Sequence, residues 1–170
     1  MCWIPNPATT SWRLVAILEI GRGRGVAAGL ICQRLESGKL LAIDRSGTAV
    51  AAARARNAAH VEAGKARFEA VSLADLDPVA AGRFDKALAV NVNLFWTRPA
   101  RVELDLVARL PRPGGRLHLV YELPAGGSAT RISTVLNGGL SAAGYRYRTV
   151  PAPAAPTTMY AVTAIPPAGP

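Results

Sequence analysis

The chain has 170 residues, half of them apolar, and a formal net charge of +9. This length predicts one domain with a substantial core, and the lack of any run of about 18 apolar residues predicts no membrane span. The first residues do not combine a basic segment with a long apolar one, which excludes a secretory signal. We therefore expect a cytoplasmic protein.

The positive charge does not by itself indicate a nucleic-acid partner. Seventeen of the twenty basic residues are arginines, scattered along an alanine-rich chain without a basic block or interleaved aromatic residues. We expect a solvated basic surface and no nucleic-acid partner. Cys32 and His118 fall in apolar segments, where we expect them to be core residues, the histidine with one hydrogen bond. No cysteine or histidine has partners at metal-ligand spacing, so we expect no metal.

Short apolar runs alternate with segments of helical periodicity along the chain. The expected strands are Leu14–Ile20, Lys39–Ile43, Ala66–Val71, Lys86–Val92, Arg116–Tyr121, Tyr145–Val150 and Thr158–Ile165. The expected helices are Val26–Leu35, Ser46–Ala63, Arg98–Leu110 and Ala129–Ala143. This alternation predicts an α/β fold with a parallel sheet, and the proline-rich loop 151–156 joins the last two strands as an antiparallel hairpin. We expect residues 1–13 to be loose, 14–165 to form the domain and 166–170 to be a disordered tail.

The most informative stretch is the turn from an apolar strand into three alternating glycines, Gly21, Gly23 and Gly25. Glycines let the backbone pass close to a ligand, because no Cβ atom stands in the way. Asp44 ends the next apolar run, where its carboxylate can accept hydrogen bonds from both hydroxyls of a ribose. The layout predicts a nucleoside-cofactor site at the carboxyl ends of parallel strands.

Two cofactor classes fit these residues. Residues 23–28 match the dinucleotide fingerprint Gly-x-Gly-x-x-Ala, and Asp44 lies nineteen residues beyond Gly25, which favours an NAD(P)-dependent oxidoreductase. Read from Glu19, the string Glu-x-Gly-x-Gly-x-Gly resembles motif I of class I S-adenosylmethionine-dependent methyltransferases. The segment Arg83–Asn91 resembles that family's entry into strand four, and Leu110–Leu117 resembles its turn before strand five.

The resemblance to these methyltransferases covers residues 15–121. It implies a doubly wound, mostly parallel seven-stranded sheet with a C-terminal antiparallel hairpin, which is the Rossmann-like methyltransferase fold. It also implies S-adenosylmethionine as the cofactor and methyl transfer to a small-molecule acceptor as the activity. The implied cofactor-binding residues are Glu19, Gly21, Gly23, Gly25, Asp44, Ser72, Leu73 and Asn91.

The family gives most of these residues a specific role. Glu19 would lie near the methionine part of the cofactor, the glycines would pass beneath it, and Asp44 would bind its ribose. Ser72 and Leu73 stand where family members often carry an acid that faces the adenine. Asp75 either replaces that acid from one turn along or is an ordinary loop acid.

The implied catalytic residues are Asn91, Asn93 and Glu122. The segment after strand four faces the transferred methyl group in the family, so the two asparagines could orient a polar nucleophile. Phe95 and Trp96 either wall the acceptor pocket or pack under the next helix. Glu122 could serve as a general base or is a surface acid.

Three features depart from the family pattern: Arg22, Ser72 and the short segment before the first strand. Family members usually carry a few dozen residues there, and about fifteen are present here. We therefore expect weak cofactor binding unless a longer N-terminus or a homodimer covers the site. A non-catalytic methyltransferase-like domain is the third alternative.

Overall fold

The computed structural model describes residues 15–21, 23–98, 100–123, 129–150 and 159–167. The expected loose segment 1–13, Arg22, the loop 151–156 and the end of the expected tail lie outside the described residues. None of the described helices is long and apolar enough to span a membrane.

The described strands form one seven-stranded sheet in the order β3-β2-β1-β4-β5-β7-β6. Their bounds are β1 Ala16–Ile20, β2 Lys39–Asp44, β3 Ala66–Ala70, β4 Phe84–Val90, β5 Pro111–Glu122, β6 Arg146–Val150 and β7 Met159–Ile165. The strands from β1 to β5 are parallel, and β7 runs antiparallel to both β5 and β6. The expected doubly wound sheet with its C-terminal antiparallel hairpin is confirmed.

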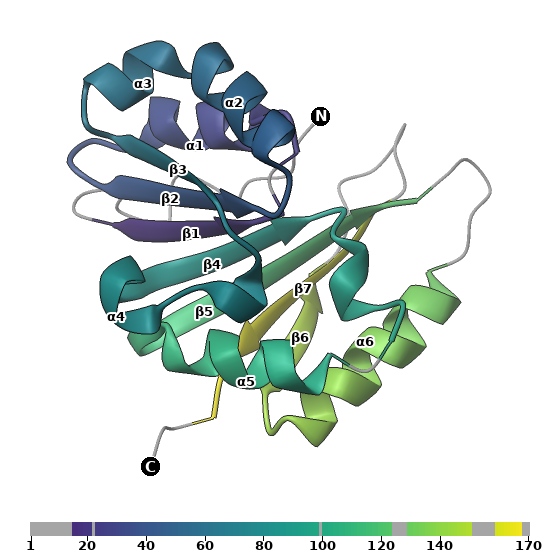
Figure 1. Ribbon diagram of the computed structural model, residues 1–170. Coiled ribbons are helices and arrows are strands. Elements are labelled where there is room, and N and C mark those ends of the chain that lie inside the picture. The colour runs from purple at the N-terminus through teal and green to yellow at the C-terminus, as the bar shows by residue number, and fades with distance from the viewer. Residues whose placement is uncertain (1–14, 22, 99, 124–128, 151–158, 168–170) are drawn as a thin grey trace.

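Helices cover the two faces of the sheet differently. Their bounds are α1 Val26–Arg34, α2 Gly47–Arg56, α3 Ala58–Glu62, α4 Pro78–Ala81, α5 Arg101–Arg109 and α6 Thr130–Ala142, with short 3-10 helices η2 Leu73–Asp75 and η3 Asn93–Phe95. Figure 1 shows α1, α2 and α3 over β1–β3, and α4, α5 and α6 on the other side of the sheet. Buried side chains of α1 and α2, among them Ile31 and Val50, form a core with β1–β3, and Leu104 and Leu136 of α5 and α6 form the core on the other side.

The expected single helix Ser46–Ala63 is wrong. Asn57, with φ −112° and ψ 25°, separates α2 from α3. Asparagine is a poor residue for a helix interior, because its short polar side chain competes for backbone hydrogen bonds. Here that side chain is buried and bonded to backbone carbonyls, which compensates for the break.

Several other boundaries also differ from the expected ones. The segment expected as a turn before strand five is already part of β5, because Pro111 lies opposite Phe84 across an irregularity in the β4–β5 register. β4 ends at Val90, since Asn91 adopts a left-handed conformation. α5 begins at Arg101, three residues after the expected start at Arg98. Arg98 precedes a proline, and such a residue is disfavoured in the helical region.

Two expected core residues are confirmed. Cys32 lies on α1 and is fully buried. His118 on β5 is 7% exposed, and its Nδ1 lies 3.1 Å from the hydroxyl oxygen of Thr163 on β7. Burial lowers the pKa of His118 to about 4, and the nearby charges of Lys86, Arg116 and Arg148 act in the same direction.

Protonation of His118 is expected to destabilise the fold in mild acid. Its pKa in the unfolded chain is near 6.5, so as the pH falls from 6.5 to about 4 the unfolded state binds a proton that the folded state excludes. The free energy of unfolding should therefore fall by up to about 3 kcal/mol over this range. The measurement is urea unfolding at several pH values for the natural chain and His118→Gln. Parallel pH profiles for the two proteins would contradict this assignment.

Candidate cofactor and acceptor site

The candidate site lies where the strand order of the sheet reverses, between the carboxyl ends of β1 and β4. The chain leaves β1 toward β2 on one side, and β4 flanks β1 on the other, which is the switch point at which open α/β sheets bind ligands. Gly21 follows β1 and Val92 follows β4. A Cβ atom on Gly21 would lie 2.7 Å from Cγ2 of Val92, so these two loops are in contact.

The three glycines of the loop serve different purposes. All have left-handed backbones, with φ of 64° at Gly21, 52° at Gly23 and 73° at Gly25. A Cβ atom on Gly25 would lie 2.5 Å from Cβ of Ala53, and one on Gly21 would meet Val92, so packing requires glycine at both. A Cβ atom on Gly23 would meet no atom within 4 Å. Packing therefore does not explain Gly23, whereas the space beside it suits a ligand.

Asp44 connects the glycine loop to β2. Its Oδ2 accepts a hydrogen bond from the backbone N–H of Gly23 at 3.1 Å, and its Oδ1 accepts one from the N–H of Ser46 at 2.9 Å. A carboxylate has about four lone-pair positions, so two acceptor positions remain for the hydroxyls of a ribose. Ser46 caps α2, because its hydroxyl oxygen accepts from the N–H of Ala49 at 3.2 Å.

The side chain of Asn57 holds the end of the glycine loop, a role that the sequence did not predict. Its Nδ2 donates to the carbonyl of Gly25 at 3.0 Å and to that of Ala53 at 2.8 Å. Gly25 precedes the first residue of α1, so this buried amide fixes the start of α1 against the end of α2. An asparagine inside an alanine–arginine helix was the local signal of a break, but nothing local indicates its partner 32 residues away.

Asn57→Ala is expected to lower the free energy of unfolding by about 1–3 kcal/mol, because it leaves two carbonyls without this donor. It should also weaken cofactor binding, since the glycine loop loses its support. Urea unfolding and a cofactor titration measure the two effects. Gln33→Ala, which removes an exposed amide from α1, is the matched control. Equal stability of the two variants would show that Asn57 does not hold the loop.

Glu19 lies inside the protein. It is 2% exposed on β1 and shares a row of the sheet with Ala42 of β2 and Leu88 of β4. Ile17 of β1 packs in the core with α1, so Glu19, two residues further on, faces the same side of the sheet. Burial raises the pKa of the Cys32 thiol on α1 to about 11, and the charge of Glu19 adds to this effect. Its contact with the methionine part of a cofactor stays a prediction.

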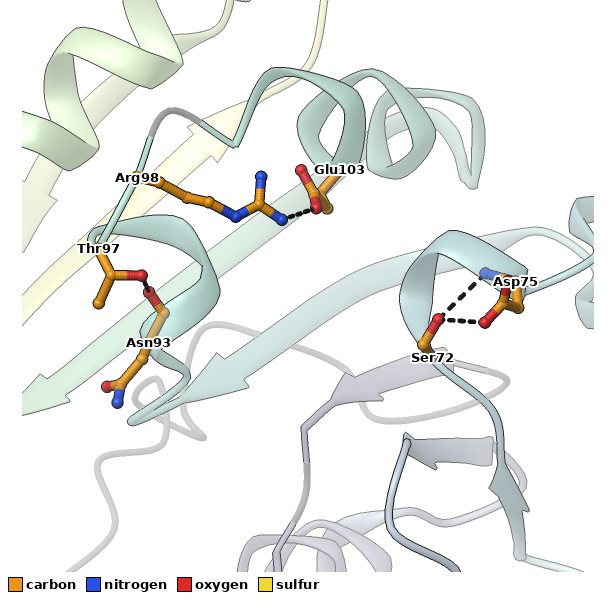
Figure 2. A network of polar contacts seen from close by, with 6 residues as sticks. All are labelled: Ser72, Asp75, Asn93, Thr97, Arg98 and Glu103. Carbon is orange, nitrogen blue, oxygen red and sulfur yellow. Dashed lines mark hydrogen bonds and ion pairs between the residues drawn. The ribbon is translucent and has the colours of Figure 1, made fainter.

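Ser72 and Asp75 form a local hydrogen-bonded pair after β3. The Ser72 hydroxyl donates to Oδ2 of Asp75 at 2.6 Å and accepts from the Asp75 N–H at 3.3 Å (Figure 2). Asp75 therefore ends the 3-10 helix that Ser72 caps, and its carboxylate remains exposed. Leu73 is 5% exposed and packs in the core, so only its backbone is available to an adenine ring.

Asn91 joins the ends of β4 and β5. Its backbone N–H donates to the carbonyl of Val120 at 2.8 Å, and its side-chain Oδ1 accepts from the N–H of Glu122 at 2.8 Å. Its φ of 55° is the one positive value recorded for a non-glycine residue in the described part of the chain. Such strained residues cluster at functional sites. The side-chain oxygen of Asn91 is thus bonded to the backbone of Glu122, whose side chain is exposed.

The segment after Asn91 folds into the 3-10 helix η3. The carbonyl of Asn93 accepts from the hydroxyl of Thr97 at 2.9 Å, and its exposed carboxamide points away from Thr97 (Figure 2). Phe95 is 2% exposed and packs in the core, as one of the two alternatives expected. Trp96 is only partly buried, with its ring edge-on to Tyr121 at 6.4 Å and beneath the guanidinium of Arg131 at 5.9 Å. It remains a candidate wall of the acceptor pocket.

The chain matches a known family over most of its parallel sheet. A family model described as a methyltransferase domain matches residues 17–115. The chain belongs to this methyltransferase domain family. A search of the curated proteins finds no match.

Solved structures agree with the family assignment. A proposed methyltransferase from Thermoplasma acidophilum has a TM-score of 0.69 and 21% identity, over 91% of this chain and 69% of that one. DhpI in complex with SAH has a TM-score of 0.67 and 16% identity, over 91% and 78%. Precorrin-6y C5,15-methyltransferase from Geobacter metallireducens has a TM-score of 0.67 and 15% identity, over 91% and 81%. At these identities the likeness shows the fold.

The family match confirms the resemblance to class I S-adenosylmethionine-dependent methyltransferases. It favours this interpretation of the glycine loop over the dinucleotide fingerprint that begins at Gly23. Among the described residues of the methyltransferase domain, no group of three or more His, Cys, Asp or Glu side chains is placed to hold a metal ion.

Proposed function

We propose that the methyltransferase domain binds S-adenosylmethionine over its glycine loop and transfers the methyl group to a polar atom of a small molecule. The observation that carries this proposal is the open space beside Gly23 next to the carboxylate of Asp44. Both lie at the switch point of the sheet, within the segment that matches the family. The backbone leaves room there for a ligand, and the acid supplies acceptors for its hydroxyls.

When bound, the cofactor supplies a methyl group already activated by a positively charged sulfur. The chain then has to align an acceptor and exclude water, and such positioning supplies much of the rate enhancement in reactions of this kind. Asp44 would fix the ribose, and Ser72 with Asp75 would face the adenine. The buried Glu19 would lie near the methionine part of the cofactor.

Three polar residues, at or just after the ends of β4 and β5, would bind and deprotonate the acceptor. The amide N–H₂ of Asn91 and the exposed carboxamide of Asn93 would hold its polar atom in line with the methyl group. Glu122, whose backbone is bonded to Asn91, would take the proton that an O–H or N–H nucleophile loses on methylation. Trp96 would offer a flat surface for the acceptor.

The left-handed conformation of Asn91 allows the role of its side chain to be separated from the role of its backbone. Asn91→Gly removes the side chain but suits φ of 55°, so the fold should be retained. If the side chain orients the acceptor and only the backbone of Asn91 contacts the cofactor, the glycine variant should bind the cofactor normally and lose about tenfold or more in turnover. Turnover equal to that of the natural chain would show that Asn91 only shapes the backbone.

A titration and a transfer assay test the function. Calorimetry should give saturable binding of S-adenosylmethionine and of S-adenosylhomocysteine, and no binding of NAD. A screen of small-molecule phenols, amines and carboxylic acids with methyl-labelled cofactor should then identify an acceptor. Cofactor binding without any transfer would favour the non-catalytic alternative. Binding of NAD alone would overturn the proposal in favour of the oxidoreductase.

A further inference from the structure

One face of the sheet is covered over only part of its width by the described helices. On the side of α1 and α2, the core contains residues of β1, β2 and β3. On β5, Leu117 and Leu119 belong to the opposite core with α5 and α6, so His118 and its alternate neighbours face the α1 side. Among the described helices none packs over β5, β7 and β6 on that side.

The strand register brings four cations together on this face. One cross-strand row contains Leu88, His118, Thr163 and Arg148. Next to it, Lys86 pairs with Arg116 and Ile165 pairs with Arg146, and the β5–β7 register continued by one residue joins these two pairs into a second row. Neighbouring strands lie about 4.8 Å apart, so the first row spans about 14 Å from β4 to β6. We call Lys86, Arg116, Arg146 and Arg148 the basic sheet face.

The cations of the basic sheet face act on one another. Burial lowers the pKa of Lys86, and the charge of Arg116 lowers it further. Asp85 opposes this shift, but its Oδ2 already accepts from the backbone N–H of Ala16 and from Arg112, both at 2.7 Å. The effect of Arg116 on Lys86 shows that positive charges act on one another across this face, and a bound anion would act in the opposite direction.

The basic sheet face is hollowed. A cavity of about 400 Å³ is lined by Arg116, Arg146, Tyr147, Arg148, Thr163 and Ile165. This volume lies in the range of sites for small molecules. In the row that crosses it, Nε2 of His118 is buried and has no hydrogen-bond partner among the described residues. Arg116 pairs with Lys86 near the start of β4, whereas the glycine loop follows the end of the neighbouring parallel strand β1, so the cavity lies toward the strand ends opposite the glycine loop.

We propose that the basic sheet face is a second binding site, which takes a small molecule bearing a diphosphate or two phosphoryl groups. Arginine is suited to phosphate because its planar guanidinium donates two parallel hydrogen bonds to the oxygens. Three arginines line the cavity beside Thr163, and their guanidinium groups offer donors to several oxygens at once. The site is separate from the proposed cofactor site and does not depend on it.

The charge and the shape of the basic sheet face favour a compact anion over a second copy of the chain or a long polyanion. A second copy of the chain would bring its own net charge of +9 against the face, which disfavours a self-contact. A long polyanion such as RNA would engage a stripe of cations with stacking aromatic rings. Here the cations surround one hollow with a single aromatic residue in its lining. A compact anion with two to four charges matches this arrangement.

Titration of the full chain with inorganic pyrophosphate tests the site. At an ionic strength of about 0.15 M, where weak surface attraction is screened, we expect saturable binding with one site per chain. In Arg146→Gln/Arg148→Gln the dissociation constant should rise about tenfold or more, because each lost contact is a charge-assisted hydrogen bond. The matched control Arg54→Gln/Arg109→Gln removes two exposed arginines from α2 and α5 and should bind as the natural chain does.

A parallel titration with S-adenosylhomocysteine and a thermal melt separate this site from the cofactor site and from the fold. Both double variants should melt as the natural chain does, since they change only exposed arginines. Equal pyrophosphate affinity in the two double variants, or no saturable binding to the natural chain, would overturn the proposal. So would binding of a 20-nucleotide single-stranded RNA that requires Arg146 and Arg148 in the absence of pyrophosphate binding.

Discussion

Gly25→Ala is expected to unfold the methyltransferase domain or to lower its free energy of unfolding by about 2–5 kcal/mol. The new methyl group would lie 2.5 Å from Cβ of Ala53, 3.1 Å from its Cα and 2.8 Å from Nδ2 of Asn57. The backbone of α2 would have to move, and overpacking of this kind costs about 1–3 kcal/mol. The left-handed φ of 73° adds about 1–2 kcal/mol for a residue with a Cβ atom.

Gly23→Ala is the matched comparison within the same loop. It carries a similar backbone cost at φ 52°, about 1–2 kcal/mol, but its methyl group would meet no atom of the protein within 4 Å. The variant should therefore fold and should lose cofactor binding, because the methyl group enters the proposed ligand space. Circular dichroism, urea unfolding and a titration with S-adenosylhomocysteine measure the contrast. Unchanged cofactor affinity in folded Gly23→Ala would contradict the placement of the ligand.

Asp44→Ala is expected to weaken binding of S-adenosylhomocysteine by about tenfold to a hundredfold. A hydrogen bond to a charged group contributes about 1.5–3 kcal/mol, and the ribose would lose at least one. The variant also removes the acceptor for the N–H groups of Gly23 and Ser46, so the loop itself would be held less firmly. Isothermal titration calorimetry gives the affinity.

Asp44→Asn serves as the control for size. Its single amide oxygen can replace only part of the acceptor capacity of a carboxylate, so its affinity should fall between those of the alanine variant and the natural chain. A folded alanine variant with unchanged affinity would contradict the role of Asp44. Asparagine and alanine variants of equal affinity would indicate that the charge, and not the shape, of the residue matters.

The sheet was predictable because its signals are local. Each parallel strand is a short apolar run, and each crossover helix of the first half follows a glycine or a capping serine, as at Gly25 and Ser46. The hairpin of β6 and β7 followed from its short proline-rich loop and from the resemblance to the methyltransferase family. The resemblance supplied the strand order, which periodicity alone does not contain.

The errors arose where contacts distant in sequence decide the local conformation. The break at Asn57 is compensated by a bond to Gly25, and the extension of β5 to Pro111 depends on pairing with Phe84. No pattern of neighbouring residues indicates either partner. The same limit applied to the glycines: the sequence showed that three were present, but not that Gly21 and Gly25 serve packing while Gly23 borders open space.

The candidate site was partly predictable for the same reason. The sequence located the cofactor residues at strand ends, and the topology brings the glycine loop and Asn91 to one switch point. The sequence did not indicate that Asn91 is held in a left-handed conformation and bonded to the backbone of Glu122. Nor did it show that Phe95 packs in the core while Trp96 stays partly exposed.

An NMR titration of the ¹⁵N-labelled chain with S-adenosylhomocysteine tests the central claim most directly, because it reports on each backbone N–H separately. The account predicts saturable shifts at Gly21, Gly23, Gly25, Ser46 and the segment Asn91–Thr97, with the signals of β6 and β7 unchanged. Saturable binding that leaves the glycine loop unchanged, or a well-dispersed spectrum that does not respond to the ligand, would contradict the assignment of this edge of the sheet as the cofactor site.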